Sequence, residues 1–228
     1  MLGRQMLERA FKAGMPCGWV AGDEVYGHDG KLRHWLEARR QSYVLAVASD
    51  QRLWRQDVHQ HRVDEIANQL SQRAWKRLSA GQGAKGDRLY DWALVRWAES
   101  EGWEHTLLAR RSLDARPEYA FYFTYAPKKK SALKTLVAVA GRRWAVEIAF
   151  QMAKGECGLD HYEVRHWQGW YRHMTLSMLA LVVLTVLRAR EKKTFSQQGS
   201  PQCTGNSASA RSPAVARLAR PGAASALV

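Results

Sequence analysis

The stretch CGWVAGDEVYG (residues 17–27) decides the fold class of this chain. It begins with a short apolar run, which predicts a strand that delivers Asp23 at its carboxyl end. Apolar residues recur at helical spacing over residues 31–40, with Asp29 placed as the N-cap, and residues 43–48 predict a buried strand. Strand, helix and strand with an acid at the tip of the first strand indicate an α/β domain, in which ligands bind at the carboxyl ends of strands.

The next part of the chain, residues 51–130, has a different character. A helix is expected over residues 63–78, followed by a glycine-rich basic loop at 81–88. Three strand-like runs come next, at residues 89–98, 105–113 and 119–126. We therefore predict a β-rich insertion between two parts of one α/β domain.

The following part, residues 131–193, is expected to be helical. Apolar periodicity predicts helices at 131–140 and 142–157, broken at Gly141. A longer apolar pattern over residues 168–190 predicts a long, largely buried helix. These helices would complete the α/β core begun by residues 1–50.

The last apolar run and the tail bear on membrane contact and order. Residues 174–187 are fewer than the roughly 20 apolar residues that a membrane-spanning helix needs, so no membrane segment is predicted. Residues 194–228 are rich in Ser, Ala, Pro, Gly and Arg and contain no acidic residue, which predicts a disordered tail. The expected divisions are therefore 1–50, 51–130, 131–193 and 194–228.

The composition restricts the class of partner and the compartment. The 228 residues carry 35 Lys and Arg against 21 Asp and Glu, a net charge of +14. Such a charge places phosphate backbones first among candidate partners, with a basic surface of no specific partner as the alternative. The three cysteines lie far apart without Cys-x-x-Cys spacing, which argues against a zinc site and for a reducing compartment.

A second acid stands out in the helix predicted over GRRWAVEIAFQMAK (residues 141–154). At about 100° per residue, Arg143, Glu147, Gln151 and Lys154 fall on one stripe. This stripe can be a solvated ladder of ion pairs, each worth only about 0.3–0.5 kcal/mol. It can also be a carboxylate that binds a divalent metal ion between cations that bind phosphates. Asp23 alone is equally open, because an Asp after a strand is often a cap or turn residue.

Several ordered motifs resemble one known family. Residues 19–27 are similar to the second-Asp segment of DDE transposases of the insertion-sequence-4 superfamily, in particular the insertion-sequence-701 group. Arg143, Glu147 and Lys154 match the last three members of the superfamily's Tyr-Arg-Glu-Lys signature in spacing. Further blocks similar to that group lie at residues 78–88, 158–165 and 169–173, so the resemblance runs from about residue 1 to residue 190.

The resemblance implies an RNase H-like core with a β-rich insertion between the second Asp and the Glu. It also implies DNA transposition, in which two Mg²⁺ ions assist strand cleavage and the attack of a 3′-hydroxyl on target DNA. Asp23 and Glu147 would be the catalytic metal ligands, and Arg143 and Lys154 would contact phosphates at the transposon end. The implied partners are double-stranded DNA and a second transposase chain, in the bacterial cytoplasm at the nucleoid.

The chain departs from the family pattern in two respects. Ala140 occupies the Tyr position of the signature. The family's first catalytic Asp would precede Met1, so the chain is expected to be a C-terminal part of a transposase, a truncated copy that is inactive alone. The alternative is a non-catalytic, basic DNA-binding remnant or an inhibitor that pairs with full-length transposase.

Two further cations are candidates for DNA contact. Lys85 and Arg88 belong to the glycine-rich loop and can bind DNA phosphates, or the loop can simply be a solvated turn. The loop is not a Walker A motif, because the final Lys-Ser/Thr pair is missing.

Overall fold

The computed structural model describes residues 2–54, 59–83, 86–163 and 165–197. Its contacts divide the chain into a compact unit of residues 1–181 and a second unit of residues 182–228, and the site described below lies within the first. The helices are α1 (Leu2–Lys12), α2 (Glu24–His28), α3 (Gly30–Glu37), α4 (Val63–Asn68), α5 (Leu133–Arg142), α6 (Trp144–Cys157) and α7 (Trp167–Gln197). Two short 3-10 helices are η1 (Gln72–Ala74) and η2 (Lys128–Lys130).

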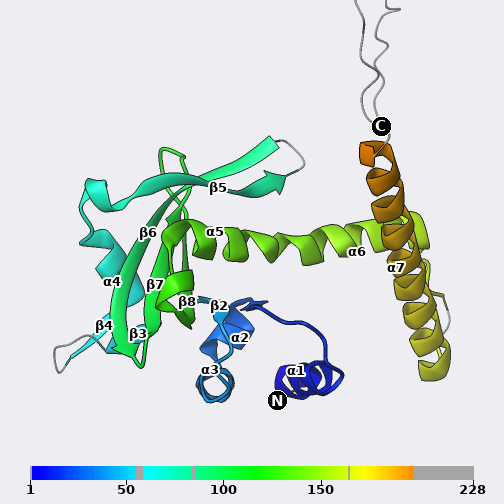
Figure 1. Cartoon of the computed structure of the whole chain (residues 1–228), viewed down its shortest axis with the longest axis horizontal. Coiled ribbons are helices and arrows are strands. Elements are labelled where there is room, and N and C mark those ends of the chain that lie inside the picture. The colour runs from blue at the N-terminus through cyan, green and yellow to red at the C-terminus, as the bar shows by residue number, and fades with distance from the viewer. Residues whose placement is uncertain (1, 55–58, 84–85, 164, 198–228) are drawn as a thin grey trace, which may run out of the picture. The chain divides into compact units, whose positions relative to one another are not determined.

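The strands form one six-stranded sheet and a separate two-stranded pair. The large sheet has the order β1-β2-β8-β7-β6-β5 and the pair is β3-β4 (Figure 1). The strand bounds are β1 (Val20–Gly22), β2 (Tyr43–Val47), β3 (Arg52–Trp54), β4 (Gln60–Arg62), β5 (Lys76–Gly83), β6 (Gly86–Ser100), β7 (Trp103–Arg111) and β8 (Tyr119–Pro127). The prediction of a mixed α/β fold is confirmed.

The strand–helix–strand unit that opens the domain is the one predicted. β1 and β2 pair in parallel, with Val20 opposite Tyr43, and the connection between them contains α2 and α3. The carboxylate of Asp29 accepts hydrogen bonds from the backbone N–H groups of Lys31 and Leu32, so Asp29 is the N-cap of α3. Parallel strands need such a crossover, which explains why two helices separate two short strands.

The strands predicted as an insertion continue the same sheet. β8 pairs antiparallel with β2, and β5, β6, β7 and β8 follow as an antiparallel meander. The helix expected over residues 63–78 was wrong in its second half, since α4 ends at Asn68 and β5 begins at Lys76. In β5, Leu78 and Ala80 lie two positions apart and both pack beside α5, as expected for one face of a strand. Over so few residues, this spacing could not be distinguished from that of a helix.

The glycine-rich loop is the end of the β5–β6 hairpin. Gly81 and Gly86 have φ angles of 99° and 107°, a region that favours glycine, so the loop composition follows from the turn itself. Lys85 lies outside the described residues, as does nearly all of the predicted tail. Residues 194–197 of that tail form the end of α7.

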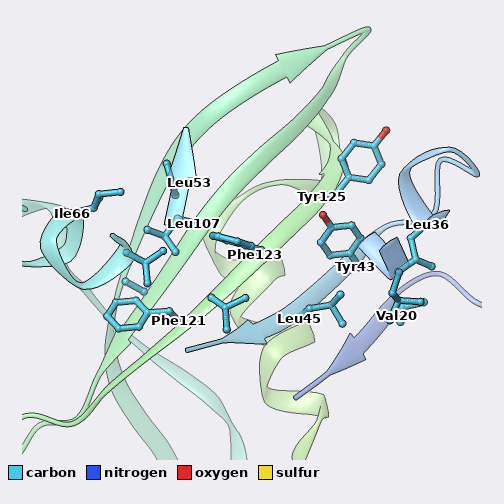
Figure 2. Packing of buried hydrophobic residues seen from close by; sticks show 14 of the residues in the cluster. Val20, Leu36, Tyr43, Leu45, Leu53, Ile66, Leu107, Phe121, Phe123 and Tyr125 are labelled. Atoms are coloured by element: carbon cyan, nitrogen blue, oxygen red, sulfur yellow. The ribbon is translucent and has the colours of Figure 1, made fainter. Parts of the chain in front are cut away.

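The sheet is covered on both faces. Along β2, Tyr43, Leu45 and Val47 join the core beneath α1, α3 and α4, whereas Val44 joins the core beneath α5. Figure 2 shows the first of these cores, in which side chains of β2, β7 and β8 pack together. Two-sided burial explains why residues 43–48 read as one continuous apolar run.

Helix α7 differs from its prediction in burial. Between residues 167 and 191 only Ser177 and Leu181 are buried, and Leu176 is 64% exposed. The prediction that this helix is largely buried was therefore wrong. Its apolar composition favours burial, but does not show that other parts of the same chain bury it. By length and composition alone, Trp167–Glu191 would also suffice to cross a membrane, a test that core helices of soluble proteins pass as well.

A polar cluster ties α3 to the sheet. The Tyr43 hydroxyl donates to Oε1 of Glu37 at 2.6 Å, and Nε2 of His105 lies 3.2 Å from the same oxygen. Burial alone would raise the pKa of Glu37, but the contacts with His105 and Tyr43 outweigh it and lower the pKa. Burial and the neighbouring Glu37 carboxylate raise the pKa of Tyr43.

This cluster predicts a specific response to acid. Because the pKa of Glu37 is lower in the folded than in the unfolded chain, its carboxylate stabilises the fold above about pH 4.3 and loses that effect as pH falls through the folded pKa. Glu37→Gln should lower the free energy of unfolding by about 1–2 kcal/mol at pH 7 and flatten its fall below pH 4.3. Urea unfolding at several pH values measures both, with the exposed Glu101→Gln as control; equal pH slopes in Glu37→Gln and wild type would contradict the prediction.

Candidate active site

Asp23 lies where β1 ends and α2 begins. Its side chain accepts a hydrogen bond from the backbone N–H of Val25 at 3.1 Å, so Asp23 is the N-cap of α2. Helix α2 packs tightly on β2 because Gly27 is buried against the Ala46 carbonyl, where any Cβ would lie 1.7 Å from the oxygen. This close contact fixes the turn that carries Asp23.

Glu147 lies on α6, directly after a second tightly packed junction. Helix α5 rests on the sheet through Leu136 and Val137, which are fully buried, and it ends at Arg142. The predicted break at Gly141 therefore occurs two residues later, at Arg143. Gly141 instead marks a close approach, since a Cβ there would lie 2.0 Å from the carbonyl oxygen of Ala80 on β5.

One cavity is lined by residues of both motifs, though Glu147 is not among them. A hollow of about 560 Å³ is lined by both Asp23 and Arg143, which lie 120 positions apart in the sequence. Nη2 of Arg143 donates to Oε1 of Glu147 at 3.1 Å, one helical turn further along α6. Ala140 also lines the hollow and brings no hydroxyl group to it.

The donor chemistry suits a hard divalent cation in part. Asp23 uses one oxygen as a cap, and the Glu147 side chain is 44% exposed and paired with Arg143. Mg²⁺ is commonly held by one or two carboxylates, with water and substrate phosphate as the other ligands. Among the described residues no group of three or more His, Cys, Asp or Glu side chains is placed to hold a metal ion.

Arg88 has a contact pattern that its sequence did not reveal. Its Nη2 donates to the carbonyl oxygens of Ala80 and Gly141, the latter at 2.9 Å, and its guanidinium lies 5.4 Å from the centre of the Trp144 ring. The side chain therefore links the β5–β6 hairpin to the junction that precedes Arg143. Lys154, two turns beyond Glu147 on α6, is exposed.

Sequence reasoning missed other residues of the hollow. Tyr90, Arg110, Tyr122 and Trp144 all line it. Arg110 follows Leu108 by two positions on β7, and this alternation could have placed it on the face that α5 covers. Its proximity to Asp23 depends on strand order, which no local pattern shows.

The sequence model described as the transposase DDE domain matches residues 2–183. The chain belongs to the DDE transposase family. No curated protein matched the chain. Membership of the transposase family implies a DNA substrate, and the family generally uses divalent metal ions. The match includes both the β1–α2 turn with Asp23 and the α6 segment with Glu147.

Proposed function

We propose that this transposase domain takes part in metal-dependent cleavage and transfer of DNA strands, with Asp23 and Glu147 as two of its metal ligands. The observation that carries the proposal is the shared cavity: Asp23 and Arg143 line it together, and Arg143 is ion-paired with Glu147. The hollow thus brings Asp23 to the arginine that pairs with Glu147, although Glu147 itself is not among the lining residues.

In this proposal the acidic side chains bind metal and the basic side chains bind phosphate. Asp23 and Glu147 offer carboxylate oxygens, and a bound Mg²⁺ would neutralise negative charge that develops on the transferred phosphate. Arg143 and Lys154 orient phosphates of the transposon end, since guanidinium and ammonium groups both bind phosphate well. Arg88 adds positive charge to the hollow, although two backbone carbonyls already occupy its Nη2. Lys85 remains a proposed phosphate contact.

The type of catalytic core and the transposase group are also part of the proposal. We infer an RNase H-like core of the insertion-sequence-4 type, close to the insertion-sequence-701 group, with a pair of Mg²⁺ ions. The parallel β1–β2 pair and the meander that follows it support this inference. The partners would be transposon ends and target DNA, with a second transposase chain, at the nucleoid of a bacterial cell. The net charge of +14 favours such partners.

The first test is Mn²⁺ binding by the purified chain, which does not require the chain to be active alone. Asp23→Asn and Glu147→Gln should each weaken Mn²⁺ binding by roughly 10-fold or more, because each removes a carboxylate ligand; unchanged Mn²⁺ binding in both variants would refute the assignment. The second test is nicking of supercoiled plasmid with Mn²⁺, in which either change should lower any nicking rate by roughly 100-fold or more, because a metal ligand contributes several kcal/mol to the transition state. Glu156→Gln changes the charge of the same helix by the same amount and should leave the rate unchanged. Nicking that survives both Asp23→Asn and Glu147→Gln would refute the assignment.

A non-catalytic role is the second candidate. It is favoured by the lack, among described residues, of a group of three or more metal-ligating side chains. A DNA-binding remnant, or an inhibitor that pairs with full-length transposase, would bind DNA in a salt-dependent way without nicking. Its binding would be insensitive to Mg²⁺ and to Asp23→Asn, whereas the catalytic proposal expects Mg²⁺ to tighten binding only while both acids are present.

A further inference from the structure

We propose that Arg110 binds a phosphate group of the DNA substrate in the hollow beside Asp23. The inference rests on the proposed function, because that function supplies the phosphodiester ligand. It adds a binding residue on β7, outside the motifs that resemble the transposase family.

The position of Arg110 follows from the strand alternation. Arg110 pairs with Trp92 on one side and Ala120 on the other, and it lines the same hollow as Asp23 and Arg143. The next residue, Arg111, points to the opposite face, where it lies 3.3 Å from Asp91 and 4.5 Å from the centre of the Trp75 ring. Two neighbouring arginines thus have opposite environments.

The charge of Arg110 is not matched by an acid. Among the described residues, Arg111 has Asp91, Arg143 has Glu147, and no ion pair or hydrogen bond joins Arg110 to another group. Its Nε is buried and lacks a hydrogen-bond partner. A half-buried guanidinium without an acceptor is costly, so this position favours an anionic ligand that reaches the hollow.

The neighbouring ring holds the guanidinium in place. The guanidinium carbon of Arg110 lies 4.4 Å from the centre of the Tyr90 ring, and Tyr90 lines the hollow too. Stacking on an aromatic face orients the planar fork of an arginine, and a fixed fork loses less conformational freedom when it binds phosphate by two parallel bonds. A phosphate held by Arg110 would share the hollow with Asp23, one of the two candidate metal ligands.

The test measures binding of a mixed-sequence DNA duplex in EDTA, so that no cleavage is needed. Arg110→Gln should weaken binding roughly 10-fold and reduce the slope of log K against log salt by about 0.9, the value for one lost phosphate contact. Arg73→Gln is the matched control, since Arg73 is exposed on η1 and is not among the residues that line the hollow. Arg110→Lys should restore the slope but not the full affinity, because an ammonium group binds phosphate without the fork.

A second measurement on the wild-type chain covers the case in which Arg110→Gln does not fold. DNA should protect Arg110 from modification by phenylglyoxal, read by mass spectrometry of peptides, while Arg73 reacts equally with and without DNA. Unchanged slope in a folded Arg110→Gln variant, or equal modification of Arg110 in both conditions, would overturn the proposal. Arg110-dependent DNA binding together with unchanged Mn²⁺ binding in Asp23→Asn and Glu147→Gln would instead refute only the metal-ligand assignment, so the two failures are distinguishable.

Discussion

Gly27→Ala should destabilise the domain by about 3 kcal/mol or more, the upper end for overpacking a filled site. The added methyl group would lie 1.7 Å from the carbonyl oxygen of Ala46 and 2.8 Å from its carbonyl carbon. Neither atom can rotate away, since both belong to the backbone of β2. Helix α2 would therefore have to move off the strand, and with it the turn that carries Asp23.

Thermal unfolding and urea titration measure this effect, and Gly30→Ala is the control. The nearest atom to a Cβ at Gly30 is the end of the Arg33 side chain at 3.7 Å, an ordinary contact with a group that can shift. Gly30→Ala should be neutral or slightly stabilising, because alanine has the higher helix propensity. Equal unfolding midpoints for Gly27→Ala and Gly30→Ala would show that α2 does not pack on β2 as described.

The sequence predicted those elements of the fold that depend on the pattern of neighbouring residues. The strand before Asp23, the N-cap at Asp29 and the buried run of residues 43–48 each follow from neighbouring residues. The antiparallel runs around β6, β7 and β8 were found for the same reason. By contrast, residues 75–80 contain apolar side chains at spacings that suit either a helix or a strand, and pairing with β6 decides between them.

The missing parts of the site depend on contacts between distant segments. Gly27 and Gly141 are unremarkable glycines in sequence, yet each allows two backbones to meet. The sequence suggested that Arg88 either binds DNA phosphate or lies in a solvated turn, and its bonds to Ala80 and Gly141 arise only when the hairpin reaches α5. Arg110 reaches the hollow with Asp23 through the strand order β2-β8-β7. Such contacts have no local signature.

Gly141→Ala should damage both stability and the candidate site, because it acts where the β5–β6 hairpin meets the end of α5, directly before α6. Its methyl group would lie 2.0 Å from the oxygen and 2.7 Å from the carbon of the Ala80 carbonyl. Strand β5 would have to separate from α5, which would also strain the bond from Arg88 to the Gly141 carbonyl at 2.9 Å. The expected loss is about 1–3 kcal/mol of unfolding free energy.

The same change should weaken DNA nicking more than the stability loss explains, because Arg143 follows Gly141 by two residues and would shift away from Asp23. Gly155→Ala is the matched control on α6: nothing lies within 4 Å of a Cβ there, so this variant should gain about 0.5–1 kcal/mol from helix propensity. The comparison is made below the unfolding transition of both variants, where each is fully folded. If folded Gly141→Ala bound Mn²⁺ and nicked plasmid as Gly155→Ala does, the junction would not position Arg143 and Glu147. The contact between the hairpin and α5 would then serve stability alone.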